Sequence, residues 1–377
     1  MNKIQTVGII GGGQLGRMLT MAAIPLGFKV VVLERGDTSP ASQVGAEQIS
    51  GNIKSAEDIG KLAKVCDYMT IEVEHVNVDA MEQASVDGVS VNPKPSTVGL
   101  IQDKYIQKGT FHSAGLPVVE YAVVGTKDEL KTVWEEFGKD VFLKSRTGAF
   151  DGRGNYRITN EADIDKAFDK LKGGGLYVEK TVNIDKELAV VVARDINNEV
   201  KMYPVVEIVH ERSICTETIA SAIVDTAVAD RATQLAADVL EHLEGAGVFA
   251  VEMMLTTDGD ILINEVAPRV HNSGHYTMDA CVTGQFEQHI RAITGLPLGD
   301  TRMLDKACVM HNILGEENHE VQLSGLQEAL RHPGCSVHIY GKSPTKVDRK
   351  MGHINVVAPT AEEAQRIARL ARKAIRI

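Results

Sequence analysis

Short apolar runs alternate with amphipathic stretches through the amino-terminal part of the chain. Runs rich in β-branched residues predict buried strands at 6–10, 29–33 and 68–73. Apolar positions at helical spacing predict helices at 14–23 and 56–64. Because buried apolar strands separated by helices are typical of parallel sheets, the pattern predicts a Rossmann-like α/β unit.

The pattern changes twice further along, which predicts three domains: 1–107, 108–186 and 187–377. The two later domains have longer β-rich runs and fewer strand–helix alternations. The strands predicted there are 141–145, 176–179, 188–194 and 200–209, with a hairpin over 248–266. The helices predicted there are 127–137, 229–244, 285–294 and 361–376.

Composition narrows the class of protein. A formal net charge of -11 over 377 residues argues against nucleic-acid binding, which needs a basic surface. The five cysteines are scattered and form no C-x-x-C pair, which favours a reducing, cytoplasmic setting over a disulfide framework or a zinc site. The apolar run near the amino terminus is too short for a signal peptide or a membrane span, so we expect no membrane partner.

A glycine loop follows the first predicted strand. Residues Gly11–Gly16 match G-x-G-x-x-G and lead into a helix, an arrangement that can bind a phosphate at the helix amino terminus. Glu34 ends the next strand, where the ribose of NAD is bound in Rossmann enzymes. An NAD-dependent dehydrogenase and a tight turn without a ligand are both compatible with this motif.

A second glycine loop lies in the middle domain. Lys144 ends a predicted strand, and 145–155 holds three glycines and two arginines. Such a loop can cover a polyphosphate with N–H donors and guanidinium groups, although the ending of a Walker P-loop is missing. The alternative is a solvated hairpin connection. The strand over 176–182 can offer its backbone to an adenine, and Glu187 can accept from ribose hydroxyls.

The hairpin near the end of the chain's middle third carries paired carboxylates. Asp258-Gly259 between apolar strands predicts a two-residue turn, and counting outward places Glu252 opposite Glu265. Two carboxylates so close repel unless a cation lies between them, and Mg²⁺ prefers oxygen ligands. Strict alternation directs Asn264 to the other face unless a bulge redirects it. The alternative is a surface face that tolerates the repulsion.

A polar loop follows the hairpin directly. The segment 267–276 packs an arginine, two histidines, an asparagine and a serine between a proline and a glycine. These groups can bind a small planar anion and stabilise charge during group transfer, although a hydrogen-bonded structural loop is the alternative. A second basic segment, 348–355, alone is compatible with a solvated turn.

Several segments together resemble one enzyme family. LKSRTGAFDGRGN, VEKTV, FAVEMM, NEVAPRVHNSGHYT and RKMGHIN occur in this order. The chain is similar over nearly its whole length to the N5-carboxyaminoimidazole ribonucleotide synthetases of the ATP-grasp superfamily. The resemblance implies an ATP-grasp fold with a Rossmann-like pre-ATP-grasp domain, a small central lid domain and a carboxy-terminal domain. Phe150 stands where many relatives have tyrosine.

The resemblance also implies roles for individual residues. Mg²⁺ would be bound by Glu252 and Glu265. Bicarbonate and its activated form would be handled by Arg269, His271, Asn272 and Lys350. The ribonucleotide would lie near Gln14, Leu15, Glu74 and Arg349. ATP would be bound by Lys104, Lys144, Ala149, Phe150, Asp151, Gly152, Arg153, Gly154, Asn155, Glu179, Lys180, Thr181, Val182, Glu187, His210, Asn264 and Glu265.

The implied reaction converts aminoimidazole ribonucleotide, bicarbonate and ATP, with Mg²⁺, to N5-carboxyaminoimidazole ribonucleotide, ADP and phosphate through carboxyphosphate. We further expect a cytoplasmic homodimer whose product is passed to a mutase. The fungal form of the family carries that mutase as a fused domain, and this chain contains no mutase sequence. Two other interpretations stay open at this stage: the NAD-dependent dehydrogenase, and a nucleotide-sensing binding protein without turnover.

Overall fold

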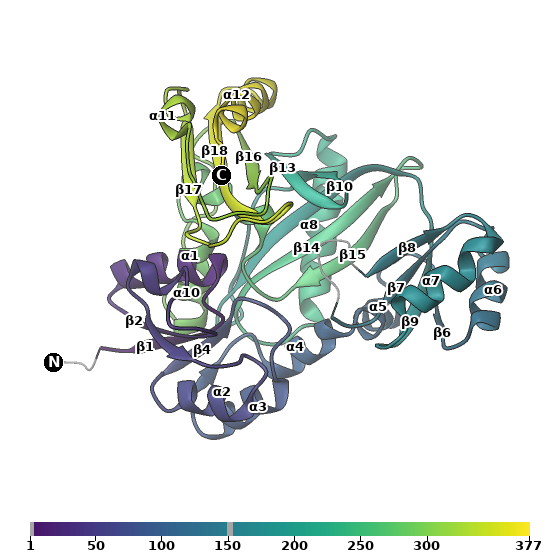
Figure 1. Cartoon of the computed structure of the whole chain (residues 1–377), viewed down its shortest axis with the longest axis horizontal. Helices are drawn as coiled ribbons and strands as arrows, with labels where there is room; N and C mark the ends of the chain where they lie inside the picture. Colours follow the sequence, from purple (N-terminus) through teal and green to yellow (C-terminus); the bar gives the residue numbers. More distant parts are fainter. Residues whose placement is uncertain (1–3, 149–153) are drawn as a thin grey trace.

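The computed structural model describes residues 4–148 and 154–377 and arranges them around three sheets (Figure 1). The amino-terminal sheet is parallel, with the strand order β3-β2-β1-β4-β5. Its strands are β1 (Thr6–Ile10), β2 (Lys29–Glu34), β3 (Glu47–Ser50), β4 (Tyr68–Ile71) and β5 (Ser90–Val91). Its helices are α1 (Gln14–Ala23), α2 (Ala56–Ala63), α3 (Val78–Val86) and α4 (Pro95–Gln102). The predicted parallel α/β unit is confirmed.

The middle region is a small antiparallel sheet with two helices on it, at the right of Figure 1. The strand order is β6-β9-β7-β8. The strands are β6 (Tyr121–Val124), β7 (Val141–Ser145), β8 (Asn155–Ile158) and β9 (Leu176–Lys180). The helices are α6 (Lys127–Glu136) and α7 (Ile164–Leu171), preceded by α5 (Lys104–Ser113). Helix α6 begins with a capping box between Thr126 and Glu129, which fixes its first turn.

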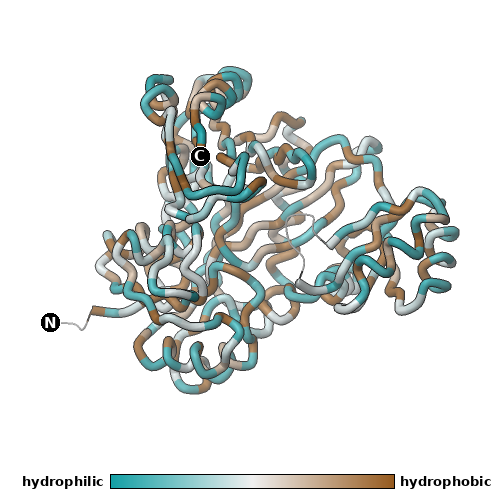
Figure 2. The backbone as a smooth tube through the Cα atoms, viewed as in Figure 1, coloured by the Kyte–Doolittle hydropathy of each residue, from teal (hydrophilic) through white to brown (hydrophobic). Residues whose placement is uncertain are grey.

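The carboxy-terminal region forms a nine-stranded sheet in the order β15-β14-β10-β12-β13-β16-β18-β17, with β11 on β10. The strands are β10 (Ile184–Arg194), β11 (Val200–Met202), β12 (Val206–Glu211), β13 (Ile214–Ala220), β14 (Gly247–Thr256), β15 (Ile261–Ala267), β16 (Ala307–Leu314), β17 (Cys335–Ile339) and β18 (Lys350–Ala358). The helices are α8 (Thr226–Glu241), α9 (Thr277–Ala280), α10 (Gln285–Thr294), α11 (Leu326–Ala329) and α12 (Ala361–Ala374). Hydrophobic residues follow the strands of this sheet, whereas the lid helices are largely hydrophilic outside (Figure 2).

One predicted strand is wrong. The run 200–209 was expected to be continuous, but β11 and β12 are separate strands. Pro204 lies between them and has no N–H to donate to a ladder. The apolar pattern alone did not reveal that break.

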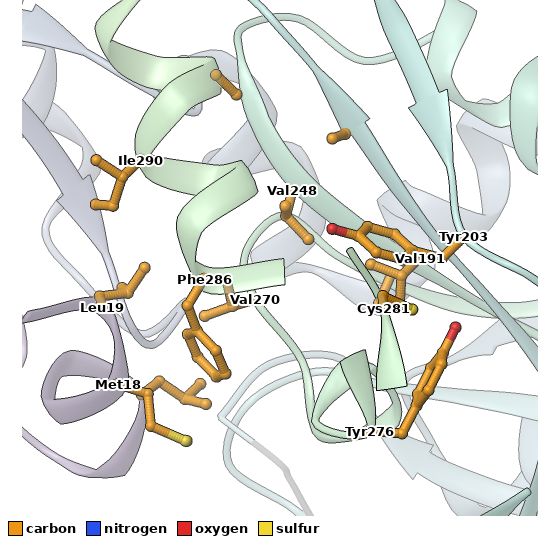
Figure 3. Packing of buried hydrophobic residues seen from close by; sticks show 14 of the residues in the cluster. Met18, Leu19, Val191, Tyr203, Val248, Val270, Tyr276, Cys281, Phe286 and Ile290 are labelled. Atoms are coloured by element: carbon orange, nitrogen blue, oxygen red, sulfur yellow. The ribbon is translucent and has the colours of Figure 1, made fainter. Parts of the chain in front are cut away.

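A shared core joins the amino-terminal sheet to the large sheet. Met18 and Leu19 of α1 face Phe286 and Ile290 of α10 in one buried cluster (Figure 3). The buried ring of His289 adds a polar link, because its Nδ1 accepts from the Val248 N–H at 3.0 Å and its Nε2 lies 2.8 Å from the Thr70 hydroxyl. These contacts fix the amino-terminal domain against the floor of the large sheet.

Helix α5 and the segment after it lie along the outer strand of the large sheet. The Gln107 side chain accepts from the Val266 N–H at 3.1 Å, and the Ile263 N–H donates to the Pro117 carbonyl at 2.8 Å. Helix α5 therefore connects the amino-terminal domain to the lid while its first turn faces β15. Among the described residues, no helix is long and apolar enough to cross a membrane.

Candidate functional site

Strands β14 and β15 form the acidic hairpin, and its turn differs from the predicted one. The Thr256 N–H donates to the Asp260 carbonyl at 2.8 Å, and the Gly259 N–H donates to the Thr256 carbonyl at 3.0 Å. Gly259 has φ of 89°, the left-handed conformation that glycine adopts without strain. The loop thus holds three residues, Thr257 to Gly259, and the predicted two-residue turn is wrong.

The carboxylate pair nevertheless forms, because a bulge compensates for the longer turn. Near the turn Met253 pairs with Ile263, a register that would place Asn264 opposite Glu252. The register shifts between Glu252 and Met253, so that Glu252 pairs directly with Glu265 and Asn264 becomes the extra residue. The predicted pair is confirmed. Asn264 lines the same cavity as the two carboxylates, as only a bulge would allow.

The two carboxylates have different protonation behaviour. Burial, followed by the nearby charge of Glu265, raises the pKa of Glu252 to about 7. Burial opposes ionisation of Glu265 as well, but the ion pair with Lys104 outweighs it and lowers the pKa of Glu265. His271 Nε2 lies 3.6 Å from Glu252 Oε1. Glu252 therefore favours its protonated form more than Glu265 does, because Lys104 compensates the charge of Glu265.

The donor set at the hairpin fits a magnesium ion. Mg²⁺ is bound in proteins by one or two carboxylates, with water and substrate phosphates completing its shell. Glu252 and Glu265 supply the carboxylates, and the unrelieved repulsion at Glu252 is what a cation would remove. No cluster of three or more His, Cys, Asp or Glu suited to a metal occurs within 4–148 and 154–377, so phosphate oxygens would have to contribute.

A cavity of about 300 Å³ surrounds the hairpin carboxylates and collects seven of the twelve predicted ATP ligands that the structure describes. The predicted ATP ligands that line it are Lys104, Lys144, Asn155, Glu187, His210, Asn264 and Glu265. They come from α5, the lid strands and the large sheet. The sequence separates these residues widely, and the fold brings them together. Ala149, Phe150, Asp151, Gly152 and Arg153 lie outside the described residues.

Two ion pairs shape the walls of this cavity. Glu187 Oε2 lies 2.8 Å from His210 Nδ1. Burial opposes protonation of His210, but the bond to Glu187 raises its pKa. On the lid side, Lys144 Nζ lies 2.5 Å from Glu179 Oε2. His210 and Lys144, two of the predicted ATP ligands, are therefore paired with carboxylates of the protein itself.

The strand end predicted to bind adenine lies outside the residues that line this cavity. The Lys180 N–H donates to the Glu120 carbonyl at 3.0 Å, and the Thr181 N–H donates to the Asp140 carbonyl at 3.2 Å. The Glu179 side chain is buried, with 5% of its surface exposed. The adenine role of Glu179, Lys180, Thr181 and Val182 stays a prediction.

A larger cavity of about 790 Å³ opens between the amino-terminal domain and the carboxy-terminal region. All four predicted ribonucleotide residues line it: Gln14, Leu15, Glu74 and Arg349. Lys342, Lys346 and His75 also line it and were not predicted. Lys342 Nζ donates to Gln14 Oε1 at 2.5 Å, which links the first helix to the carboxy-terminal segment. Lys342 and Lys346 lie in a segment of ordinary polarity, and no sequence motif marks them as site residues.

The two cavities share a wall. His271, Asn272 and Lys350 line both of them. Asn272 is held in place by Asn312 of β16, since each amide donates to the other's oxygen, at 3.1 and 2.7 Å. The polar loop after the hairpin therefore stands between the carboxylate cavity and the larger one.

Arg269 and His271 on this loop have different electrostatic roles. Arg269 pairs with Glu74 at 2.8 Å and lines the larger cavity. Burial lowers the pKa of His271 well below its usual value, so the ring is neutral. The Ser273 N–H donates to His271 Nδ1 at 3.3 Å, which assigns the ring proton to Nε2. That N–H faces Glu252.

The N–H donors of the amino-terminal glycine loop are already bonded to carboxylates of the protein. The Gly13 and Gly16 N–H groups donate to the Glu72 carboxylate at 2.5 Å, and the Gly12 N–H donates to Glu34 at 3.0 Å. A Cβ at Gly13 would lie 2.7 Å from Glu72 Oε1, so the glycine is needed for this carboxylate. The protein's own acids occupy the donors that a dinucleotide would use, and the dehydrogenase interpretation is wrong.

Comparisons with known proteins agree with this geometry. Residues 4–102 match the ribonucleotide synthetase preATP-grasp domain, 109–286 the ATP-grasp domain, and 308–367 the phosphoribosylaminoimidazole carboxylase C-terminal domain. The boundaries of the predicted lid, 108–186, are not tested by these matches.

Two relatives show how much of each protein this chain covers. The phosphoribosylaminoimidazole carboxylase of the yeast Ogataea methanolica is 44% identical over 96% of this chain and 68% of its own length. The N5-carboxyaminoimidazole ribonucleotide synthase of Bacillus subtilis is 40% identical over 95% of this chain and 92% of its own. The chain thus spans about two thirds of its fungal relatives and nearly all of the bacterial one.

A solved structure of N5-carboxyaminoimidazole synthase from Aspergillus clavatus, in complex with ADP and 5-aminoimidazole ribonucleotide, superposes with a TM-score of 0.91. It is 38% identical, and the match covers 98% of both chains. The fold, the cavities and these relatives lead to one conclusion: the chain belongs to the N5-carboxyaminoimidazole ribonucleotide synthase family of ATP-grasp ligases.

Proposed function

We propose that this chain carboxylates 5-aminoimidazole ribonucleotide with bicarbonate at the expense of ATP, with Mg²⁺, in purine synthesis. The observation that carries the proposal is the wall common to the two cavities, formed by His271, Asn272 and Lys350. One cavity has the cations and carboxylates that suit a magnesium nucleotide. The other has room and cationic groups for a phosphorylated substrate. A group that leaves ATP would reach the second substrate across this wall.

On the nucleotide side, Lys104, Lys144 and Asn155 would bind the phosphates, and Glu187 would accept from the ribose. Glu252 and Glu265 would hold Mg²⁺. The ion would neutralise phosphate oxygens and orient the terminal phosphate for transfer. Lys104 now pairs with Glu265, so Mg²⁺ on that carboxylate would free the lysine for the nucleotide.

On the shared wall, the neutral His271 would act as a hydrogen-bond donor. Its Nε2–H points toward Glu252, where a bicarbonate oxygen beside the terminal phosphate would accept it. Lys350 and Asn272 would bind the remaining oxygens. The Asn272 amide is fixed by Asn312, so little side-chain entropy would be lost when the anion binds.

On the ribonucleotide side, Lys342, Lys346 and Arg349 would hold the 5′-phosphate, because together they form the cationic edge of the larger cavity. The exocyclic amine would then face the shared wall. Bicarbonate would attack the terminal phosphorus to give carboxyphosphate and ADP. The amine would attack the carboxyl carbon of carboxyphosphate, or of CO₂ released from it, and phosphate would leave with the amine proton.

Phosphate release tests this function directly. We expect rapid release only when 5-aminoimidazole ribonucleotide, bicarbonate, ATP and Mg²⁺ are all present, with carboxylated ribonucleotide formed in equal amount. ATP hydrolysis that ignores the ribonucleotide would contradict the proposal. Nucleotide binding without any turnover would favour the nucleotide-sensing protein instead. The homodimer, the transfer of product to a mutase and the cytoplasmic location stay predictions.

A further inference from the structure

A buried lysine next to the nucleotide cavity has no role in the function proposed above. Lys108 of α5 has 3% of its side chain exposed, and its Nζ lies 3.1 Å from Glu179 Oε1. The other oxygen of that carboxylate is 2.5 Å from Lys144 Nζ. Two lysines from different elements therefore hold one buried carboxylate.

Burial and the neighbouring charges act on the pKa values of both Glu179 and Lys108. Burial opposes ionisation of Glu179, but Lys144 and Lys108 together lower its pKa to about 2, so the carboxylate is an anion. Burial lowers the pKa of Lys108, and the charge of Glu179 acts in the opposite direction. A single carboxylate needs only one cation to be neutralised. One of the two lysines can leave, provided that the other one stays.

The positions of the two lysines show which one can leave. Lys144 lines the cavity of about 300 Å³ together with Lys104 and Asn155, whereas Lys108 and Glu179 do not line it. Lys144 also has 15% of its side chain exposed, against 3% for Lys108. The Lys144 ammonium thus lies at the border between the buried carboxylate and the cavity, and Lys108 lies behind it.

We propose that Lys108 is the resident counter-ion of Glu179, and that it allows Lys144 to move from this carboxylate to a nucleotide phosphate. This inference rests on the proposed function. Without Lys108, the departure of Lys144 would leave Glu179 as a lone buried charge, which is strongly unfavourable. Lys108 is a positioning residue, because it acts through Lys144 and touches no substrate.

The same helix serves both halves of the site. Lys104 lies one turn before Lys108 on α5 and pairs with Glu265 of the large sheet, whereas Lys108 pairs with Glu179 of the lid. Lys104 is the lysine that Mg²⁺ would release, and Lys144 is the lysine that Lys108 releases. Both cations would therefore reach the phosphates without leaving an unpaired carboxylate.

Binding of two probes, Mg-ADP and adenosine, measures this role. Calorimetry would give the dissociation constants for the intact chain, Lys108→Met, Lys144→Met, Glu179→Gln and the double variant Lys108→Met with Glu179→Gln. Lys127→Met is the matched control, since Lys127 pairs with Asp169 at 3.0 Å on the exposed face of the lid. Thermal melting of each variant shows whether it is folded.

We expect Lys108→Met to weaken Mg-ADP binding about 10- to 100-fold and to leave adenosine within about threefold, because adenosine has no phosphate to draw Lys144 away. In the Glu179→Gln background the same substitution should change Mg-ADP binding less than about threefold, since no anion remains to be held. If Lys108→Met alone does not fold, the comparison of Glu179→Gln with the double variant still tests the proposal. The control should bind both probes normally.

Equal weakening of adenosine and Mg-ADP by Lys108→Met would overturn the proposal, because Lys108 would then shape the base site. Undiminished Mg-ADP binding, or a large further loss in the double variant, would overturn it as well. If Lys144→Met left Mg-ADP binding unchanged, the phosphate role of Lys144 in the proposed function would fail together with this inference. The other outcomes concern Lys108 alone.

Discussion

The amino-terminal glycine loop and the acidic hairpin present opposite situations for a carboxylate. At the glycine loop, Glu72 accepts two backbone N–H groups, and the loop closes on it. At the hairpin, Glu252 directly faces a second carboxylate, that of Glu265. The first region has the sequence motif of an anion-binding site, but its N–H donors are already bonded to carboxylates of the protein. The second has no named motif of its own, and its opposed carboxylates form the metal site proposed above. Satisfied donors, more than motifs, decide where a ligand binds.

A substitution in the hairpin should have the largest effect. It tests whether the hairpin, unlike the glycine loop, binds a ligand through its carboxylates. Glu265→Gln removes one of the two carboxylates and leaves Lys104 without its partner. We expect Mg-dependent turnover to fall about 10³-fold, the size typical of losing a charged group at a phosphoryl-transfer site. Phosphate release with both substrates measures it, and Asp258→Asn in the turn is the control. Near-normal turnover would contradict the assignment of Glu265 as a metal ligand.

The glycine loop should respond in stability. Glu72→Gln replaces an acceptor oxygen by an NH₂ group that faces a backbone N–H, so the free energy of unfolding should fall by about 1–3 kcal/mol. Urea unfolding measures the change, and Glu57→Gln on exposed α2 is the control. NAD binding should stay absent in both variants. A Glu72→Gln protein as stable as the parent would show that the loop does not depend on this carboxylate.

The bulge residue should have a smaller effect on activity. Asn264→Ala keeps both carboxylates but removes the amide that the bulge turns into the cavity. We expect turnover to fall about tenfold, which corresponds to one lost polar contact. Steady-state kinetics in ATP measures it, with Thr257→Ala in the turn as the control. Unchanged kinetics would mean that the bulge matters only for the register.

Two helical glycines give the finest comparison. A Cβ at Gly16 of α1 would lie 2.8 Å from the Gly11 carbonyl and 3.2 Å from Glu72 Oε2, whereas a Cβ at Gly60 of α2 meets nothing within 4 Å. Gly16→Ala should destabilise by about 1 kcal/mol or more, because the carboxylate is displaced. Gly60→Ala should stabilise by about 0.5–1 kcal/mol through helix propensity. Equal changes in urea unfolding would contradict the close packing around Glu72.

The fold was predictable where the local pattern of apolar residues is strong. Contacts between residues that are distant in the sequence were not predictable from such patterns. The helix Gln14–Ala23 and the strand Thr6–Ile10 have the predicted bounds, because apolar spacing alone determines them. The dehydrogenase interpretation failed since Glu72 is far in sequence from the glycines that it fills. Lys342 was missed for the same reason: it approaches Gln14 only in the folded chain.

The predicted pair of Glu252 and Glu265 is correct, although the turn from which it was counted is wrong. The count from Asp258-Gly259 assumed a two-residue turn, and the true turn is longer by one. The bulge at Asn264 adds one residue to the other strand and cancels that difference. Neither departure had a local signature strong enough to predict.

The bulge also limits where the length of the hairpin can change. Because side chains alternate along a strand, a residue lost from Ile261–Ile263 would rotate Glu265 to the opposite face unless the bulge residue took up the missing position. Loss of Asn264 itself would leave Glu265 opposite Glu252, since Met253 already pairs with Ile263 next to it. Length changes in β15 should therefore be absorbed at the bulge, and grafting the hairpin onto another sheet requires the bulge to be transferred with the two carboxylates.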